Sequence, residues 1–462
     1  MPIRNSLRTP DTTAELPHAR RASAPSPALT LTASLLGFAL IMLDASVVNV
    51  ALPSMGSDLG GGMAGLQWVV DAYTIAFAAL LLSTGAFSDR IGATRAYTVG
   101  ITLFTLASVA CGLAPNLPAL IGFRVVQGIA AAVVLPTTLA LVRQAYADPA
   151  QRGRAVSLWA AGGTTAAALG PVAGGALTTA WDWRAIFFIN LPVGLVALAL
   201  TFRAPRSPRR PAPLDLPGQL TAVLALAALA FAVIERGTTA LVALGVAVVS
   251  LAVFLRIESH HPHPVVPLGL FRDRTVAVAV TSGSALSVAF YGMIFVFSLY
   301  FQQVRDRSAL AAGLMFLPMT GLLVVVNVLS GRLANRYGPR LPMLTGQLLS
   351  VGGLLLLLFV GTDTPLLLTS ALLVPLALGA GLALPPLTAA MMEAVPTDRA
   401  GVAAGVLNAA RQVSGGLGVA AFGALVAGDF KTGLRTSLVI SAALLTLTAL
   451  ATTRLARGGA GS

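Results

Sequence analysis

Residues 85–95, Gly-Ala-Phe-Ser-Asp-Arg-Ile-Gly-Ala-Thr-Arg, form a short polar stretch between two long apolar runs. Its pattern returns 246 residues later as Gly-x-x-x-Asn-Arg-x-Gly at 331–338, again between two apolar runs. A Leu-Pro pair repeats at 135–136 and 384–385, with an offset of 249 residues. A polar loop that recurs at matched places in two hydrophobic halves indicates an internal duplication, which is common among membrane transporters.

The composition excludes a water-soluble protein. The chain has 462 residues, of which 56% are hydrophobic and only 10% are charged, whereas soluble domains carry about 25% charged residues. Apolar runs of about 20 residues recur along the chain, the length that a helix needs to cross a bilayer. A transmembrane β-barrel would alternate polar and apolar residues, which 354–360 does not. The sequence therefore predicts an all-α polytopic membrane protein.

The formal net charge of +13 does not indicate a nucleic-acid partner, because the arginines are spread over the loops with no basic face. The single cysteine, Cys111, lies in an apolar run, so no disulfide framework exists. Only one lysine accompanies abundant Ala, Gly and Arg, a composition typical of a GC-rich bacterial genome.

We predict fourteen spans, and the distribution of basic residues sets their orientation. The spans are 28–52, 67–86, 96–114, 117–142, 155–179, 185–203, 218–235, 239–257, 275–301, 309–333, 341–361, 365–391, 402–427 and 436–453. With a cytoplasmic N-terminus, the inside segments hold 22 of the 30 Lys and Arg residues and the outside segments hold 6. This bias predicts cytoplasmic termini and a location in the bacterial cytoplasmic membrane.

The repeat offset predicts the domain order, because it exceeds one six-helix half by about 70 residues, enough for an extra hairpin and its linkers. We expect a disordered cytoplasmic tail (1–27), an N-terminal six-helix bundle (28–203), a cytoplasmic linker (204–217), two extra helices (218–257), a cytoplasmic loop (258–274), a C-terminal six-helix bundle (275–453) and a second tail (454–462).

Six motifs occur in the same order as in a known transporter family. They are the loop at 85–95, the first-span stretch Leu-Asp-Ala-Ser-Val-Val-Asn-Val-Ala-Leu-Pro at 43–53, Arg-Val-Val-Gln-Gly at 124–128, the Gly/Pro positions of 162–175, residues 183–192, and residues 411–418. Together they resemble the major facilitator superfamily, specifically its fourteen-spanner drug:proton antiporter branch. The sequence departs from that pattern at Ala93 and Thr94, where basic residues are usual, and at Asn335, where Asp is usual. Only the first copy of the loop therefore has an acidic residue, Asp89, that could form a gating salt bridge.

The resemblance implies a major facilitator fold of two six-helix bundles with a central two-helix insertion. It also implies proton-coupled export of a small amphipathic drug or antibiotic by alternating access, which would confer resistance. We expect a monomer in the lipid bilayer, with protons and the drug as partners and no cofactor.

Asp44 and Arg124 are the predicted proton-coupling pair. Asp44 lies about nine residues, or roughly 13 Å, below the outer end of its span, and Arg124 lies at similar depth in the fourth span. A carboxylate at that depth costs on the order of 2.5–3.5 kcal/mol, so intramembrane charges usually pair and serve function. The alternative is a purely structural role. In the second half, the position aligned with Arg124 is Leu373, so this pair of charges occurs in the first half only.

Other polar residues on the spans are candidates for the substrate cavity. Gln127 shares a helix face with Arg124, whereas Asn49 points about 140° away from Asp44. Asp71, near Tyr73, is either a second acidic site for cationic drugs or an interfacial residue. Arg411, beside Gln412, either lines the cavity or bonds to backbone carbonyls. The cavity candidates are Asp71, Tyr73, Asn49, Gln127, Arg411 and Gln412.

Two segments are candidate gates. In the loop, Gly85, Asp89, Arg90 and Gly92 would latch the cytoplasmic side, unless the two charges simply end a helix. In the fifth span, Gly163, Gly170 and Gly174 fall within about 40° of one another, a stripe that permits close helix contact. Gly170, Pro171 and Gly174 would form a gate, or would only pack.

The sequence lacks the motifs of an enzyme or an ATP-driven pump. The one lysine, Lys431, lies in Asp-Phe-Lys-Thr and not in a phosphate-binding loop, and no hydrolase motif occurs. We therefore expect neither an enzyme nor an ATP-driven pump. His260, His261 and His263 could bind a metal, but a solvated loop fits better and we predict no metal site. A membrane scaffold or receptor would not need Asp44 and Arg124 at matched depth. An importer or facilitator with the same fold stays open as an alternative.

Overall fold

The computed structural model describes residues 27–202, 207, 209, 215–235, 237–262, 264, 266–396 and 400–455, and within them every regular element is helical. The predicted N-terminal tail and most of the predicted linker and C-terminal tail lie outside the described residues.

The first half contains seven helices: α1 (Pro27–Leu59), α2 (Gly62–Ile91), α3 (Ala93–Gly112), α4 (Leu117–Ala145), α5 (Pro149–Ala180), α6 (Ala185–Phe188) and α7 (Asn190–Thr201). Between α1 and α2 the chain reverses over Gly60, Gly61 and Gly62, whose φ angles of 73°, 90° and 58° are left-handed and favour glycine.

The extra hairpin and the second half follow. The hairpin is α8 (Leu216–Ile234) and α9 (Thr238–His260). The second half comprises the 3₁₀ helix η1 (Leu268–Arg272), α10 (Arg274–Leu299), the π-helical η2 (Tyr300–Val304), α11 (Ala309–Met315), α12 (Leu317–Tyr337), α13 (Arg340–Leu357), α14 (Leu366–Glu393), α15 (Ala400–Val426) and α16 (Phe430–Thr453). Polar caps fix several starts, for example Asp273, whose carboxylate accepts from the backbone N–H of Thr275 at 2.7 Å.

Twelve helices in the described residues are long and apolar enough to cross a membrane. The glycine-rich α5 is not among them, and the segment Ala185–Thr201 is a shorter apolar helix. The chain is thus an all-helical, multi-pass membrane protein, and fourteen spans stay a prediction. Leu241, Val242 and Val249 of α9 are 70%, 63% and 63% exposed, as expected for side chains that face lipid.

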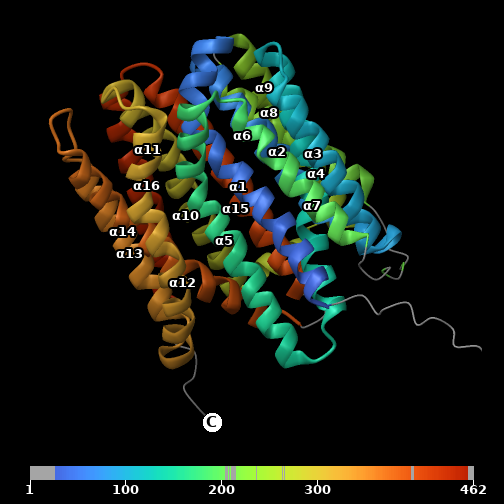
Figure 1. Ribbon diagram of the computed structural model, residues 1–462. Helices are drawn as coiled ribbons and strands as arrows, with labels where there is room; N and C mark the ends of the chain where they lie inside the picture. The colour runs from blue at the N-terminus through green and yellow to red at the C-terminus, as the bar shows by residue number, and fades with distance from the viewer. Residues whose placement is uncertain are drawn as a thin grey trace, which may run out of the picture.

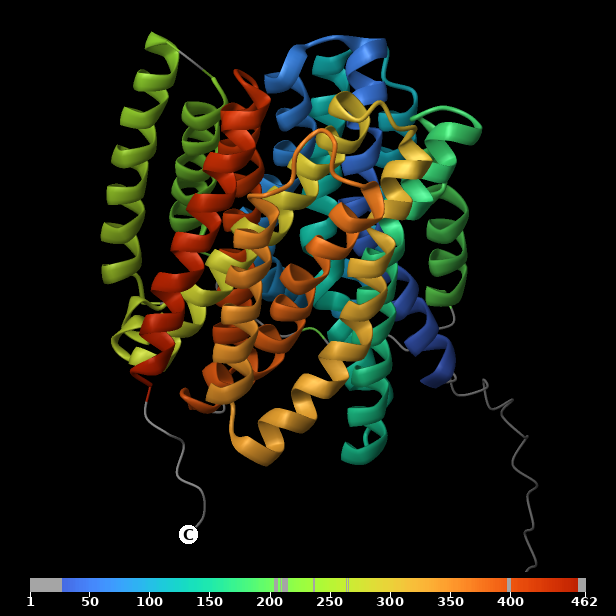
Figure 2. The ribbon, with the colours of Figure 1, turned by 90° about the vertical axis from the view of Figure 1, so that its left-hand side faces the viewer.

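The helices form two bundles that meet along a central interface (Figure 1). In the first half α1 packs on α5 and α4 packs on α2 and α3, whereas in the second half α10 packs on α15 and α14 packs on α12 and α13. Across the interface α2 contacts α15, and α5 contacts α11. The α8–α9 hairpin stands at one edge of the molecule, where α8 touches both α2 and α15 (Figure 2).

The first residue of α1 and the last of α16 lie at the same end of the molecule, the lower end in Figure 2. We refer to it as the terminus end and to the other as the opposite end. Because successive helices reverse direction, α2, α4 and α9 finish at the terminus end, and α5, α10 and α15 begin there.

Candidate functional site

A cavity of about 1470 Å³ lies between the two halves. Its walls come from α1, α2, α4 and α5 on one side and from α10, α12, α14 and α15 on the other. Asp89, Arg143 and Arg272, which stand at the terminus end, also line it, so that end is the mouth of the cavity.

Hydrogen bonds between the halves seal the opposite end. The Oγ of Ser298 on α10 donates to the carbonyl of Asn49 at 2.8 Å, and the Nε2 of Gln302 donates to the carbonyl of Val50 at 3.0 Å. On the other flank the Nε2 of Gln67 on α2 donates to a backbone carbonyl of α15 at 2.7 Å. In the part of the chain that the structure describes, the halves are therefore joined at the opposite end, and the cavity lining reaches the terminus end.

Aromatic rings form much of the apolar wall. Phe38 of α1 stacks on Trp159 of α5, with 4.2 Å between ring centroids and 17° between planes. The indole N–H of Trp159 donates to the Oγ of Thr138 at 3.1 Å, which fixes its orientation. Across the cavity Phe290 and Tyr291 of α10 meet edge to face at 5.5 Å.

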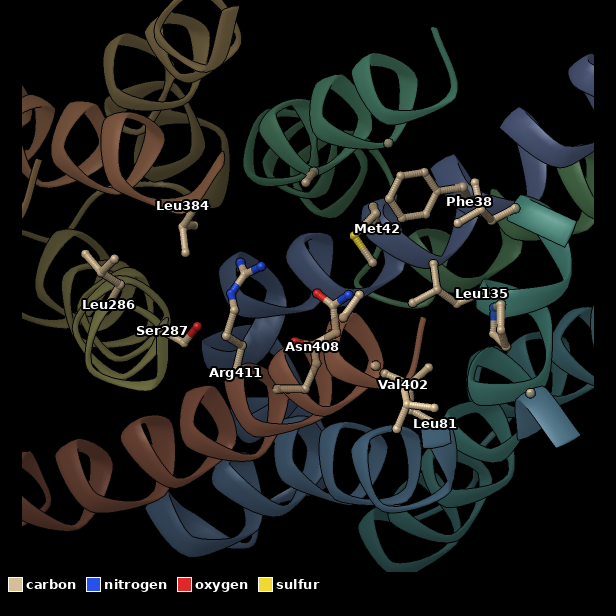
Figure 3. A pocket seen from close by; sticks show the side chains of 18 of the residues that line it. Phe38, Met42, Leu81, Leu135, Leu286, Ser287, Leu384, Val402, Asn408 and Arg411 are labelled. Atoms are coloured by element: carbon tan, nitrogen blue, oxygen red, sulfur yellow. The ribbon is translucent and has the colours of Figure 1, made fainter. Parts of the chain in front are cut away.

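Polar side chains on α1 and α15 complete the lining. The predicted cavity residues Asn49, Arg411 and Gln412 all line the cavity. Arg411 extends into it from α15 (Figure 3), and its Nε is buried without a hydrogen-bond partner in the described residues. Arg411 stands eleven residues into α15, roughly 16 Å along the helix from its start.

The predicted pair of Asp44 and Arg124 is brought together in a buried network within the first half. Asp44 is fully buried, and a guanidinium nitrogen (Nη1) of Arg124 lies 2.6 Å from its Oδ2. The Nε2 of Gln127 and the Nδ2 of Asn190 donate to Oδ1 at 2.8 and 2.9 Å. Arg124 also donates from Nε to the Val69 carbonyl at 3.1 Å. Three donors thus compensate the carboxylate, and the guanidinium also donates to the Val69 carbonyl and to the Oε1 of Gln127.

Three predicted cavity residues lie elsewhere in this conformation. Gln127 is bound to Asp44, and the ring of Tyr73 lies under the guanidinium of Arg124, 4.2 Å from centroid to Cζ. Asp71 is buried at the α2–α15 contact, where its Oδ1 lies 3.2 Å from the position of a Cβ built on Gly416. None of the three lines the cavity, contrary to the prediction. The neighbouring helices decide this, because they enclose the faces that carry these side chains.

Asn190 is the network member to which the sequence analysis gave no role. It opens α7, and it donates both to Asp44 and, at 2.9 Å, to the Oγ of Ser108 on α3. Its signal in the sequence was its position within residues 183–192, a matched motif with an amide inside an otherwise apolar run.

The glycine stripe of α5 is in close contact with α1. A Cβ at Gly163 would collide with the ring of Phe38, one at Gly170 with Ser46, and one at Gly174 would lie 2.5 Å from the carbonyl of Val47. Nearer the opposite end, the contact crosses between the halves. A Cβ at Gly175 would collide with the backbone of α11, and one at Gly313 of α11 with the carbonyl of Pro171. Glycine therefore permits both the α1–α5 packing and the closed contact between the halves.

The loop candidates lie at the mouth. Gly85 and Asp89 line the cavity, and the side chains of Asp89 and Arg90 are exposed. Gly92 has a φ of 89° and separates α2 from α3. Beside the mouth, the Nδ1 of His261 lies 3.7 Å from the Oδ2 of Asp215. His263 lies outside the described residues, within which no three potential ligands form a metal site.

Comparison with known proteins defines the class. The model of the Major Facilitator Superfamily matches residues 34–419, and the chain belongs to this family. The fold agrees with solved structures: a D-xylose-proton symporter superposes with a TM-score of 0.70 at 16% identity, covering 93% of this chain and 98% of that one. A bacterial homologue of the human lysosomal transporter Spinster, inward-facing and unoccupied, superposes with a TM-score of 0.67 at 18% identity, covering 93% and 97%.

Several curated relatives are named for drug resistance. The chain is 38% identical over 410 residues to the multidrug resistance protein Stp of Mycobacterium tuberculosis, covering 86% of this chain and 76% of that protein. It is 37% identical to the methylenomycin A resistance protein of Streptomyces coelicolor, covering 90% and 88%. It is 32% identical to the tetracenomycin C resistance and export protein of Streptomyces glaucescens, covering 86% and 76%.

Proposed function

We propose that this chain exports a small amphipathic drug or antibiotic from a bacterial cell in exchange for protons, and thereby confers resistance. The drug-resistance and export names of the relatives support the substrate class and the direction. We further propose fourteen spans, with α5 and α6–α7 crossing the membrane, a monomer, and both termini in the cytoplasm. The terminus end is then cytoplasmic, and the structure corresponds to an inward-open state.

One observation carries the proton coupling: a carboxylate buried among three donors, on the same helix that forms the outer seal. Protonation of Asp44 removes the negative charge that holds Arg124, Gln127 and Asn190. The ion pair and hydrogen bonds that hold α1 against α4 and α7 then weaken. Five residues further along α1, the carbonyl of Asn49 accepts the Ser298 hydrogen bond that closes the opposite end. The protonation state of Asp44 thus biases the outer seal through one rigid helix.

We propose a cycle of four steps around this linkage. In the inward-open state Asp44 is ionised and paired, and the substrate enters the cavity from the cytoplasm. The halves then rock so that the cavity opens outward, where a proton from the medium neutralises Asp44 as the substrate leaves. The neutral form returns to the inward-open state and releases the proton to the cytoplasm, where the pair with Arg124 re-forms. The loop residues Asp89 and Arg90 would latch the mouth in the outward-open state, when the two halves meet there.

Proteoliposomes test the proposal. Asp44→Asn should abolish substrate-stimulated proton movement, because the amide cannot exchange a proton, whereas the exposed loop variant Asp363→Asn should behave as wild type. Full coupling in Asp44→Asn would reject the proposed role of that residue. In a drug-sensitive host, resistance that persists after a protonophore collapses the gradient would reject antiport itself.

Import or facilitated diffusion is the second candidate, because the D-xylose-proton symporter shares the fold. Direction distinguishes the two: accumulation of the compound inside cells that express the chain, rather than depletion, would favour the importer.

A further inference from the structure

The charge of the transport cavity has a consequence for the substrate. The acidic residues in its described lining are Asp89, Asp215 and Glu258, and all three stand at the mouth, at helix ends. The buried acids Asp44 and Asp71 do not line the cavity. Within the described lining, the one charged side chain away from the mouth is therefore a cation, Arg411.

Arg411 has unused hydrogen-bonding capacity. Its aliphatic stem packs beside Gly283 of α10, where a Cβ would lie 3.3 Å from its Cγ. Its Nε is buried and has no partner in the described residues, and Figure 3 shows the guanidinium directed into the cavity. A buried donor without a partner is costly, and a charged one more so. A guanidinium also binds carboxylate and similar anions through paired N–H groups.

The wall around Arg411 suits a planar aromatic body. The Phe38–Trp159 stack and the Phe290–Tyr291 pair line the cavity from the two halves. Asn49, Asn408 and Gln412 also line the cavity and supply neutral hydrogen-bonding groups. Figure 3 shows Arg411 and Asn408 of α15 and Met42 and Phe38 of α1 facing one cavity.

We propose that the cavity selects amphipathic aromatic anions, with the acidic group on the guanidinium of Arg411 and the rings against the aromatic walls. This inference rests on the proposed export function and names its substrate class. A cation would face the positive charge of Arg411 with no acidic side chain of the described lining beside it, so the pocket disfavours cationic drugs.

Binding to the purified protein tests the inference without any transport step. Sulforhodamine B and rhodamine 6G share a cationic xanthene ring system. Two sulfonates give sulforhodamine B a fixed net charge of −1, whereas rhodamine 6G has a net charge of +1. Fluorescence anisotropy should give a Kd at least about tenfold lower for sulforhodamine B, since a charged hydrogen bond contributes about 1.5–3 kcal/mol and tenfold corresponds to about 1.4. Arg411→Gln should weaken sulforhodamine B binding by about tenfold or more and leave rhodamine 6G unchanged or tighter.

Two further variants separate charge from folding. Arg411→Lys should retain most of the preference for the anion, and Arg435→Gln, at an exposed position of α16, should match wild type. Equal or tighter binding of rhodamine 6G, no measurable binding of either dye, or an unchanged ratio in Arg411→Gln would overturn the inference.

Transport of the same dyes separates this inference from the proposed function. Exchange of a monoanion for one proton moves two charges across the membrane, whereas exchange of a monocation moves none. A potassium–valinomycin potential, negative inside, should therefore drive sulforhodamine B efflux more strongly than an equivalent pH gradient alone. If the dye binds through Arg411 and is not moved by either gradient, the export proposal fails and the binding inference stands. If rhodamine 6G is exported and sulforhodamine B neither binds nor moves, the export proposal stands and the inference fails.

Discussion

A single methyl group at the contact between α5 and α11 should shift the protein toward its outward-open state. A Cβ at Gly313 would collide with the carbonyl of Pro171, a contact that joins the two halves. A backbone carbonyl cannot turn away as a flexible side chain can, so Gly313→Ala must push the halves apart there. Overpacking of this kind costs about 1–3 kcal/mol. Because the cost applies only when the contact is closed, the ratio of inward-open to outward-open protein should fall about 5- to 150-fold.

Cysteine accessibility measures this shift. The only native cysteine, Cys111, is buried, so Cys111→Ala combined with Leu323→Cys gives a reporter in the cavity lining. In right-side-out vesicles a membrane-impermeant thiol reagent should modify the Gly313→Ala protein several-fold to more than tenfold faster than the reporter alone.

The control is Gly321→Ala on α12, where an added Cβ meets nothing within 4 Å. It reproduces the gain in helix propensity, which is up to about 1 kcal/mol, without the collision. Equal labelling of the two glycine variants, or slower external labelling of Gly313→Ala, would refute the reasoning.

Three other outcomes are expected, each measured as thermal unfolding of the purified protein. Gly174→Ala should lower the apparent Tm by overpacking, whereas Gly153→Ala in the same helix should not, because nothing lies within 4 Å of its Cβ; equal effects would contradict the close α1–α5 contact. Asp44→Asn and Arg124→Gln should each cost about 3–5 kcal/mol, and the double variant less than their sum; strict additivity would exclude the pairing. Hydrogen bonds from the first turn of α16 hold the pKa of Asp429 below 3.8. The stabilisation that this cap gives the protein is therefore present above that pH and disappears as the pH falls through the folded pKa. The Tm deficit of Asp429→Ala should vanish in acid, and a deficit that grows there would be inconsistent with the cap.

The pairing of Asp44 with Arg124 could be predicted from the sequence because depth in a membrane is a one-dimensional quantity. Two opposite charges at similar depth in an apolar medium have few alternatives to meeting. Helical periodicity also placed Asn49 correctly on a face away from Asp44, and it lines the cavity. The position of each residue along its own helix sufficed for both predictions.

The surroundings of Gln127, Tyr73 and Asp71 could not be predicted in the same way. Periodicity states which residues share a face, but not which neighbouring helix covers that face. Gln127 shares a face with Arg124 as predicted, yet that face is occupied by the carboxylate of Asp44 rather than by the cavity. Asp71 is covered by α15, a helix from the other half of the chain.

The ends of the helices could not be predicted from the hydropathy pattern either. The first span was predicted to end at residue 52, yet α1 continues to Leu59 through an internal proline. An apolar run marks the part of a helix that lies in lipid, whereas the backbone hydrogen-bond ladder continues through polar residues until a turn such as the one at Gly60 ends it.

The side-chain donors to Asp44 all belong to the first half, and the second-half position aligned with Arg124 holds the buried, apolar Leu373. Under the proposed coupling through Asp44, the proton gradient would act on the first half only, whereas Arg411 lies in the second half. Chimaeras that exchange the C-terminal domain between relatives should consequently inherit a new spectrum of exported compounds while they keep the parental dependence on the gradient. With substrate selection and proton coupling in different halves, substitutions that change the exported compound could arise in one half without altering the coupling in the other.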